Sequence, residues 1–412
     1  MLKAAIGKRL VFHLGGYDPM PPDAVHRRFL RELRRFQSTW GLQAQTTDPE
    51  ISASEARWQI ATSGPGWRVE TEYRLIRWDD VIAAGVQRST WRRVPLGLLA
   101  FADFLFGGAL WGYLRTNWRY AGFFLYPYLL LSIFSLVALA GGTTLGILAS
   151  SALVGTAATC GLFVALLRWP GRLLFLHPLL DDWIFAREYI RGEHPVLGPR
   201  LDAMARNLCE TARAGAVDEI LVIGHSLGAV LAIDLLDRAL QLEPMLGRNG
   251  GPRVAFLSVG SSIPKIGLHR AARRFRAAVE RVAHSPAIFW GEYQALTDVM
   301  NFYKADPIAC MGLSGRSPII RQVRVRAMLE PAAYARVKGN FFRVHCQFVS
   351  ANDRRAAYDY FMFVCGPFAT EDEVRSQDGA ISAMAAGGRL SGPPAPRPRA
   401  VRPERRPRAA RR

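Results

Sequence analysis

The spacing of hydrophobic residues changes several times along the chain, and each spacing predicts a different element. Residues 9–14, RLVFHL, form a short apolar run that predicts a strand, and the Gly- and Pro-rich residues 15–22 predict a loop. Residues 24–36 repeat hydrophobic side chains every three or four positions between arginines, which predicts an amphipathic helix. Residues 57–78 alternate on either side of a Ser-Gly-Pro-Gly turn and predict a β-hairpin.

The C-terminal half alternates between short apolar runs and helical repeats. A helix is predicted over 199–213. Strands are predicted over 220–223, 253–259, 287–294 and 340–349. Strands separated by helices are typical of a mostly parallel sheet, so the predicted fold class is α/β.

The longest hydrophobic stretch, Tyr120 to Leu167, contains 48 residues without Asp, Glu, Lys or Arg. As helix it would extend roughly 72 Å at 1.5 Å per residue, whereas the hydrocarbon core of a bilayer is about 30 Å thick. Two membrane-spanning helices therefore fit, near 121–140 and 145–167, with Gly-Gly-Thr-Thr at 141–144 as the turn. Buried helices of a soluble core are the alternative, but such helices rarely lack charge for so long.

The residues around this stretch predict its orientation. Arginines flank both outer ends and the turn carries no charge, so the positive-inside rule places both ends in the cytoplasm. Those arginines are Arg115, Arg119, Arg168 and Arg172, and Trp111, Trp118 and Trp169 stand where interfacial aromatic residues occur. A further apolar run, 96–114, contains Asp103 and several glycines, which favours an interfacial or re-entrant segment over a span.

The net charge of +19 indicates a polyanionic partner, either nucleic acid or an anionic membrane surface. Residues 389–412 hold nine Arg and one Glu in a Pro- and Ala-rich run, which predicts a disordered basic tail that could lie on anionic lipid. Nucleic-acid binding is not expected, because no folded recognition motif accompanies the charge.

The remaining composition bears on the compartment. The five cysteines are scattered without a Cys-x-x-Cys pair, so we expect reduced thiols in the cytosol and neither a disulfide framework nor a zinc site. The only apolar run near the N-terminus, Leu10 to Leu14, is too short for a secretory signal. The excess of Arg over Lys is typical of a GC-rich bacterial genome, so the expected location is a bacterial inner membrane.

The segment GHSLG, 224–228, is a G-x-S-x-G motif between an apolar run and a helical pattern. That context predicts a strand–turn–helix unit that presents the Ser226 hydroxyl above the sheet. Gly224 and Gly228 leave room for the strained turn, and His225 completes it. The Leu227 N–H at the start of the helix would face a developing oxyanion.

A serine hydroxyl needs a base to take its proton, and in this arrangement the chain order is Ser, acid, His. His269 and His284 precede every plausible acid, whereas His345 follows them and is the predicted base. For the acid, Asp298 lies just beyond a predicted strand. Asp306 stays open as the alternative, although its Asp-Pro context favours a turn.

A second oxyanion donor usually comes from the loop after an early strand. Here that loop is HLGGYDP, in which the backbone N–H of Gly16 or of Tyr17 is the candidate donor. Gly16 would let the backbone approach a ligand closely. His13, at the end of the same strand, is expected to pack there and not to take part in chemistry.

These motifs resemble the α/β-hydrolase family, in particular its lipase and esterase branch. The resemblance rests on GHSLGA at 224–229, on GGYDP at 15–19, and on the order Ser226, Asp298, His345. It covers residues 9 to about 350, with the apolar stretch as an insertion, as in bacterial lipase-like proteins that carry membrane segments. It implies a hydrolase without metal or organic cofactor. The early loop lacks the family's usual His-Gly pair, and no soluble lid is recognisable.

The sequence therefore predicts a membrane-anchored serine hydrolase that cleaves an ester, with an acyl lipid as the expected substrate. Its hydrolase domain would be divided into 1–95 and 177–370 by a membrane insertion at 96–176, with a basic disordered tail at 371–412. The alternative from another class is a non-catalytic protein of hydrolase fold that acts as a membrane scaffold or lipid-binding protein.

Overall fold

The computed structural model describes residues 2, 6–192, 194–248 and 250–391, and the strands within them form one nine-stranded sheet. The order is β2-β4-β5-β1-β6-β7-β8-β9, with β3 paired to β4. The strands are β1 (Lys8–Leu14), β2 (Gln43–Thr46), β3 (Glu50–Ile51), β4 (Glu55–Gly64), β5 (Trp67–Ile76), β6 (Glu219–His225), β7 (Arg253–Val259), β8 (Ile288–Ala295) and β9 (Ile319–Val323). The ladders from β5 through β1 to β9 are parallel, and those of β2, β3 and β5 with β4 are antiparallel.

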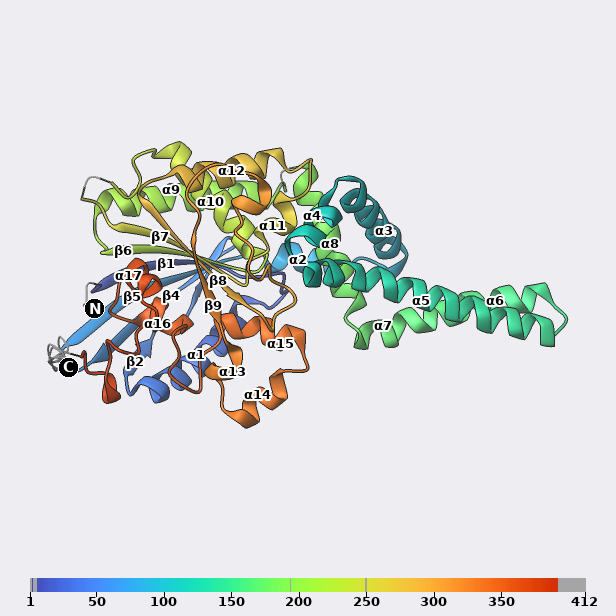
Figure 1. Cartoon of the computed structure of the whole chain (residues 1–412), viewed down its shortest axis with the longest axis horizontal. Coiled ribbons are helices and arrows are strands. Elements are labelled where there is room, and N and C mark those ends of the chain that lie inside the picture. Colours follow the sequence, from blue (N-terminus) through green and yellow to red (C-terminus); the bar gives the residue numbers. More distant parts are fainter. Residues whose placement is uncertain (1, 3–5, 193, 249, 392–412) are drawn as a thin grey trace, which may run out of the picture.

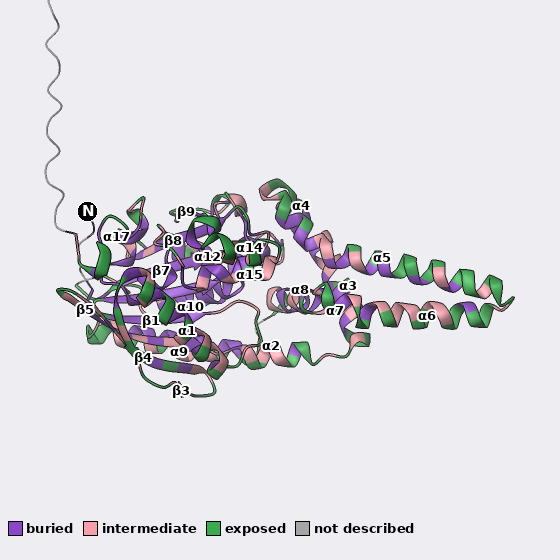
Figure 2. Cartoon of the chain, turned by 90° about the horizontal axis from the view of Figure 1, so that it is seen from below, coloured by how far each residue is buried: buried purple, intermediate pink, exposed green. Residues whose placement is uncertain are grey.

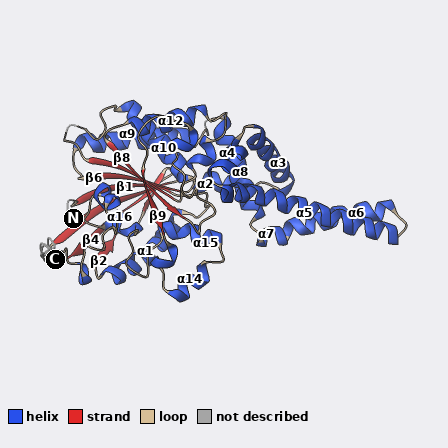
Figure 3. Ribbon diagram, in the orientation of Figure 1, coloured by secondary structure: helices blue, strands red, loops and turns tan. Residues whose placement is uncertain are grey.

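The predicted α/β class is confirmed as a mixed, mostly parallel sheet, and Figure 3 shows it between helices. The strand predicted over 340–349 is wrong. Those residues form helix α15 (Phe341–Cys346) and a short 3-10 turn, because the Asn340 side chain caps the helix by accepting the Arg343 N–H. The last strand is β9, whose half-exposed residues at the edge of the sheet give no apolar run.

Helices cover both faces of the sheet (Figure 1). One face carries α9 (Leu197–Ala214), α10 (Gly228–Leu242) and α12 (Arg273–His284), with α11 (Ile263–Gly267) at its edge. The other carries α1 (Pro22–Trp40), α13 (Val325–Met328), α14 (Pro331–Val337), α15 and α16 (Tyr360–Cys365). Alternate residues of each strand enter the two cores: Leu10 and Phe12 pack with α10, whereas Val11 packs with α1.

A two-helix hairpin projects from one end of this body (Figures 1 and 2). It consists of α5 (Trp118–Leu148) and α6 (Ala152–Arg168), and both helices are long and apolar enough to cross a membrane. Large apolar side chains such as Leu136, Ile147 and Leu153 are exposed along it, which is the state expected in lipid and not in water.

The turn of this hairpin was predicted at Gly-Gly-Thr-Thr, which is wrong, because α5 continues to Leu148 and the chain reverses at 149–151. Gly142 instead faces α6, where a Cβ atom would collide with Thr159. Gly146 meets Gly155 in the same way. These glycines let the helices touch, and the threonine hydroxyls are satisfied by carbonyls one turn back, as Thr143 is by Leu139.

The base of the hairpin is a cluster of helices against the body. It contains α2 (Asp79–Val86), α3 (Thr90–Phe106), α4 (Ala109–Thr116), α7 (Pro170–Leu173) and α8 (Leu176–Arg191). The run 96–114 falls on α3 and α4, which are bent by 67° against each other, so it would form a third span only as a broken one.

The region assigned to a disordered tail at 371–412 begins too early. Residues up to 391 are folded: α17 (Thr370–Arg375) packs its Val374 against β8, and Met384 and Leu390 form a β-bridge. Val374, Ala380 and Met384 are buried. The burial of these few apolar side chains is enough to dock the segment on the sheet. The rest of the predicted tail, 392–412, lies outside the described residues.

Candidate active site

Ser226 occupies the turn between β6 and α10 in a strained backbone conformation. Its φ is 56°, in the left-handed region that residues other than glycine rarely adopt. The turn is held by the Ser226 N–H, which donates to Val259 O at 3.1 Å, and by the Ser226 carbonyl, which accepts from the Ser262 N–H at 3.1 Å. A buried strand before it and a buried helix after it fix the hydroxyl at the carboxyl edge of the sheet.

Two glycines make this turn possible. A Cβ atom on Gly224 would collide with the backbone of Ala229, and one on Gly228 would collide with the carbonyl oxygens of Leu14 and Gly15. The strand, the turn and the helix therefore lie so close together that only glycine fits at these two positions. The sequence prediction for these two positions agrees with the packing.

His345 and Asp298 are joined by a buried hydrogen bond, with His345 Nδ1 at 2.7 Å from Asp298 Oδ2. An ionised carboxylate only accepts hydrogen bonds, so the hydrogen lies on Nδ1 and the Nε2 lone pair is free to take a proton. Asp298 is fixed in turn by the Met300 N–H, which donates to Oδ1 at 2.8 Å. Nε2 is buried and has no hydrogen-bond partner among the described residues.

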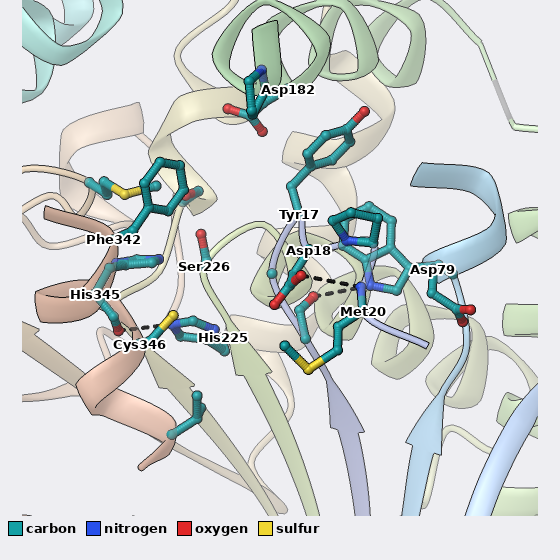
Figure 4. Close-up of a pocket in the computed structure, with 18 of the residues that line it drawn as sticks. Tyr17, Asp18, Met20, Asp79, Asp182, His225, Ser226, Phe342, His345 and Cys346 are labelled. Carbon is teal, nitrogen blue, oxygen red and sulfur yellow. Dashed lines mark hydrogen bonds between the residues drawn. The ribbon is translucent and has the colours of Figure 1, made fainter. Parts of the chain in front are cut away.

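Ser226 and His345 line one cavity of about 450 Å³. Figure 4 shows both side chains on one side of it, with Tyr17 and Asp18 opposite. The residues come from four places in the fold: the β6–α10 turn, helix α15, the loop after β1, and the base of the hairpin. Because Nε2 has no partner, the serine–histidine hydrogen bond is not made in this state, as is common before a substrate binds.

The alternative acid, Asp306, has a different contact. Its Oδ1 accepts the backbone N–H groups of Ile308 and Ala309, and so it shapes a local turn away from His345. Of the two acids left open by the sequence, only Asp298 reaches the imidazole.

The three other histidines considered from the sequence have other hydrogen-bond partners. His269 is hydrogen-bonded to Asp103 O and His284 to Ser314. His13 lines the cavity but is hydrogen-bonded to the hydroxyl of Tyr360, and burial lowers its pKa to about 3, which keeps it neutral.

The candidate oxyanion donors meet next to the serine. A Cβ atom added to Gly16 would lie 3.0 Å from Ser226 Cβ, so the loop after β1 passes directly over the nucleophile turn. The backbone N–H groups of Gly16, Tyr17 and Leu227 donate to no acceptor in the described part of the chain. The Tyr17 side chain points elsewhere, into a ring cluster with Trp78 and Phe185.

His225 has a supporting position that its place in the motif did not reveal. Its Nε2 lies 3.2 Å from His345 O, and the two imidazole rings are 4.6 Å apart. Burial and the neighbouring His345 hold the pKa of His225 well below its usual range. A neutral His225 therefore braces the backbone of α15 without competing for the proton.

The wall of the cavity also contains a buried ion pair that the sequence does not predict. Lys265 Nζ lies 2.5 Å from Asp182 Oδ2 and 4.1 Å from the ring centre of Trp183. Burial lowers the pKa of Lys265, and Asp182 opposes that effect. The available signal was that Lys265 is one of only five lysines in the chain and lies six residues after the strand predicted over 253–259.

Comparison with known proteins adds no relative. No family model, no curated protein and no solved structure matches this chain. Among the described residues, no group of three or more His, Cys, Asp or Glu side chains is placed to hold a metal ion.

Proposed function

We propose that this protein is a membrane-anchored serine hydrolase that cleaves an ester of an acyl lipid, with Ser226, His345 and Asp298 as its catalytic triad. The observation that carries the proposal is the Asp298–His345 hydrogen bond, which orients a free Nε2 in the cavity where a strained Ser226 is presented. The order of the strands around β6, with β1 beside it, supports an α/β-hydrolase type of sheet.

The reaction follows from these positions. Ser226 Oγ attacks the acyl carbonyl carbon while His345 Nε2 accepts the hydroxyl proton, and Asp298 stabilises the imidazolium. The bond from the acyl carbon to the alcohol oxygen then breaks, and Nε2 returns the proton to the leaving alcohol. In the second half, Nε2 takes a proton from water, the hydroxide attacks the acyl-enzyme, and Ser226 recovers its proton as the acid leaves.

The negative charge that develops on the carbonyl oxygen needs donors in fixed positions. The Leu227 N–H lies at the N-terminal end of α10, and the N–H of Gly16 or Tyr17 approaches from the loop after β1. Since these groups donate to no other acceptor in the described chain, they are available to the oxyanion.

The hairpin supports the proposed substrate class and location. From Leu129 to Leu148, α5 is about 30 Å long, which matches the hydrocarbon thickness of a bilayer. The basic residues at its base favour a body on the cytoplasmic face of the inner membrane. The active cavity is lined by Tyr120 and Phe123 from the same helix, so it lies beside the lipid headgroups. Anionic lipid is the expected partner of the basic residues 392–412.

The nucleophile is tested with a fluorophosphonate probe on the full-length protein in detergent micelles. We expect the wild-type protein to be labelled and Ser226→Ala not to be, with His345→Ala reducing the rate of labelling by at least about 100-fold. Asp306→Asn should label like the wild type, whereas Asp298→Asn should be slow. Equal labelling of wild type and Ser226→Ala would refute the assignment.

A non-catalytic, lipid-binding protein is the second candidate. It is favoured by the burial of Ser226, which is 8% exposed, and by the missing contact at His345 Nε2. This alternative predicts no labelling of the wild type, together with lipid binding that survives Ser226→Ala.

A further inference from the structure

A second hollow lies behind the catalytic histidine and acid. It has a volume of about 720 Å³ and runs between the base of α5 and helix α15. Its walls are largely apolar and aromatic, and include Gly122, Phe123, Tyr126, Val299, Phe341 and Val344. None of these residues has a role in the proposed reaction, so the hollow, here called the α5–α15 groove, needs its own explanation.

The groove and the active cavity are separated by aromatic side chains. Phe123 lines both spaces, whereas Phe341 lines the groove and its neighbour Phe342 lines the cavity. The ring centres of Phe123 and Phe341 are 6.2 Å apart, and Phe175 packs on Phe341 at 5.4 Å. A chain of methylene groups that rounds Phe123 would thus pass from the groove into the cavity.

The groove is also continuous with the membrane anchor. Phe123 lies six residues before Leu129, the first exposed leucine of α5, which is about 9 Å along the helix. Trp169, at the base of α6, is 77% exposed and marks the level of the lipid headgroups, which is the level of the α5 residues that follow Leu129. The groove therefore lies at the boundary between the bilayer and the body.

The charges at the groove suit a lipid. Arg119 and Lys338 line it, and both are cations beside otherwise apolar walls. A lipid phosphate or carboxylate could meet these cations while its hydrocarbon chain covers Phe123 and Phe341. Apolar walls with a few polar groups that fix orientation are the usual composition of a small-molecule site.

We propose that the α5–α15 groove binds the acyl chain of a bilayer lipid and guides its ester past Phe123 to Ser226. The proposal deepens the proposed function and rests on it. The groove flanks both catalytic partners, because Thr297 and Val299 border Asp298, and Val344 borders His345.

Gly122 offers a direct test. It lines the groove, and a Cβ atom added to it meets no other atom within 4 Å, so a larger side chain can grow into the groove without moving the backbone. Gly161 in α6 is equally open, but it lies in the membrane hairpin away from the groove, which makes Gly161→Phe the matched control.

Full-length Gly122→Phe, Gly161→Phe and wild-type protein are compared in vesicles, with p-nitrophenyl butyrate and p-nitrophenyl palmitate as substrates. We expect Gly122→Phe to lower kcat/KM for the palmitate at least about 10-fold, and to leave the butyrate rate and fluorophosphonate labelling within about two-fold. Gly161→Phe should leave both rates unchanged. An equal effect of Gly122→Phe on both esters, or no effect on either, would refute the proposal that the groove binds the acyl chain.

A direct readout avoids dependence on that variant. A fatty acid with a diazirine near its methyl end is added to vesicles containing the wild-type protein, and the photolysed protein is mapped by mass spectrometry. Labels on the peptides that contain Val299 or Phe341 support the proposal, and labels confined to residues 129–168 contradict it. Because fluorophosphonate labelling reports Ser226 by itself, a failed groove and a failed nucleophile give different results.

Discussion

At the scale of single residues, the candidate site depends on a few positions where only glycine fits, because a side chain would collide with neighbouring backbone. Gly228 is the clearest, because its Cα faces the carbonyl oxygens at the end of β1. This contact joins the loop that carries Gly16 to the turn that carries Ser226. Backbone packing therefore fixes the relative position of the two halves of the candidate oxyanion site.

Gly228→Ala should therefore destabilise the protein and also disturb the site. We expect a loss of about 1–3 kcal/mol in the free energy of unfolding, from overpacking of a rigid contact. The loss is measured by thermal or denaturant unfolding in detergent micelles. Gly339→Ala is the control, since its added Cβ meets nothing within 4 Å, and equal melting temperatures for both variants would contradict the packing argument.

A buried acid predicts the pH dependence of stability. Glu292 on β8 is 3% exposed and hydrogen-bonded to Ser258, and burial raises its pKa to about 8. Between pH 4.5 and 8 the folded protein holds a proton that the unfolded chain releases, so stability falls as the pH rises through this window. The full contribution is present below about pH 4.5.

The check is a comparison of wild-type and Glu292→Gln protein in melting experiments from pH 5 to 8.5. The wild-type protein should lose about 1.4 kcal/mol per pH unit more than the variant within the window. Parallel profiles would show that Glu292 titrates normally.

Chain order alone selected Ser226, Asp298 and His345 as candidates, and the structure places Asp298 against His345 and both Ser226 and His345 in one cavity. The choice between Asp298 and Asp306 needed coordinates, since both follow β8 and only side-chain direction separates them. The pairing of Lys265 with Asp182 could not be found from the sequence, because Asp182 lies 83 residues away on α8.

At the scale of elements, the sequence predicted the helices and strands in which hydrophobic residues repeat with a single helical or strand spacing. The strand β7 and the hairpin of β4 and β5 belong to this group. The failures are elements whose neighbours override the pattern. Residues 340–349 are as apolar as a strand, but Asn340 starts a helix there, and β9 is an edge strand whose alternation is weak. The glycines of α5 were interpreted as a turn although they serve helix packing.

The hairpin packing makes a prediction for Gly142. Gly142→Leu should separate α5 from α6, since even a Cβ atom collides with Thr159, and we expect a melting temperature several degrees lower in micelles. Gly161→Leu places the same side chain on an open surface of α6 and should melt like the wild type. Similar melting of both variants would argue against the close helix contact.

At the scale of the whole molecule, the length of the hairpin would fix the height of the body above a bilayer that the hairpin crosses. Pro127 lies inside α5 just before Leu129, and it cannot donate a hydrogen bond to the carbonyl of Phe123. The helix is therefore weakest where it leaves the body, and it can tilt there without moving the active cavity.

This joint predicts an asymmetric response to bilayer thickness. Bilayers thinner than about 30 Å should be tolerated, because the hairpin can tilt, whereas bilayers several ångströms thicker should draw the base of the hairpin inward and slow hydrolysis of a long-chain ester. The measurement compares vesicles of monounsaturated phosphatidylcholines with increasing chain length. Butyrate hydrolysis serves as the control, and a symmetric decline on both sides would count against the joint.

The pairing of β1 with β6 limits when the sheet can be completed during synthesis. Arg9 lies opposite Glu219 in that ladder. The two central strands are therefore neighbours in the sheet, but the complete hairpin lies between them in the sequence. During synthesis, β1, β4 and β5 leave the ribosome first, and they must wait without their central neighbour until both apolar helices have emerged. The turn that carries Ser226 can close only afterwards, so both apolar helices are complete before the candidate site can form.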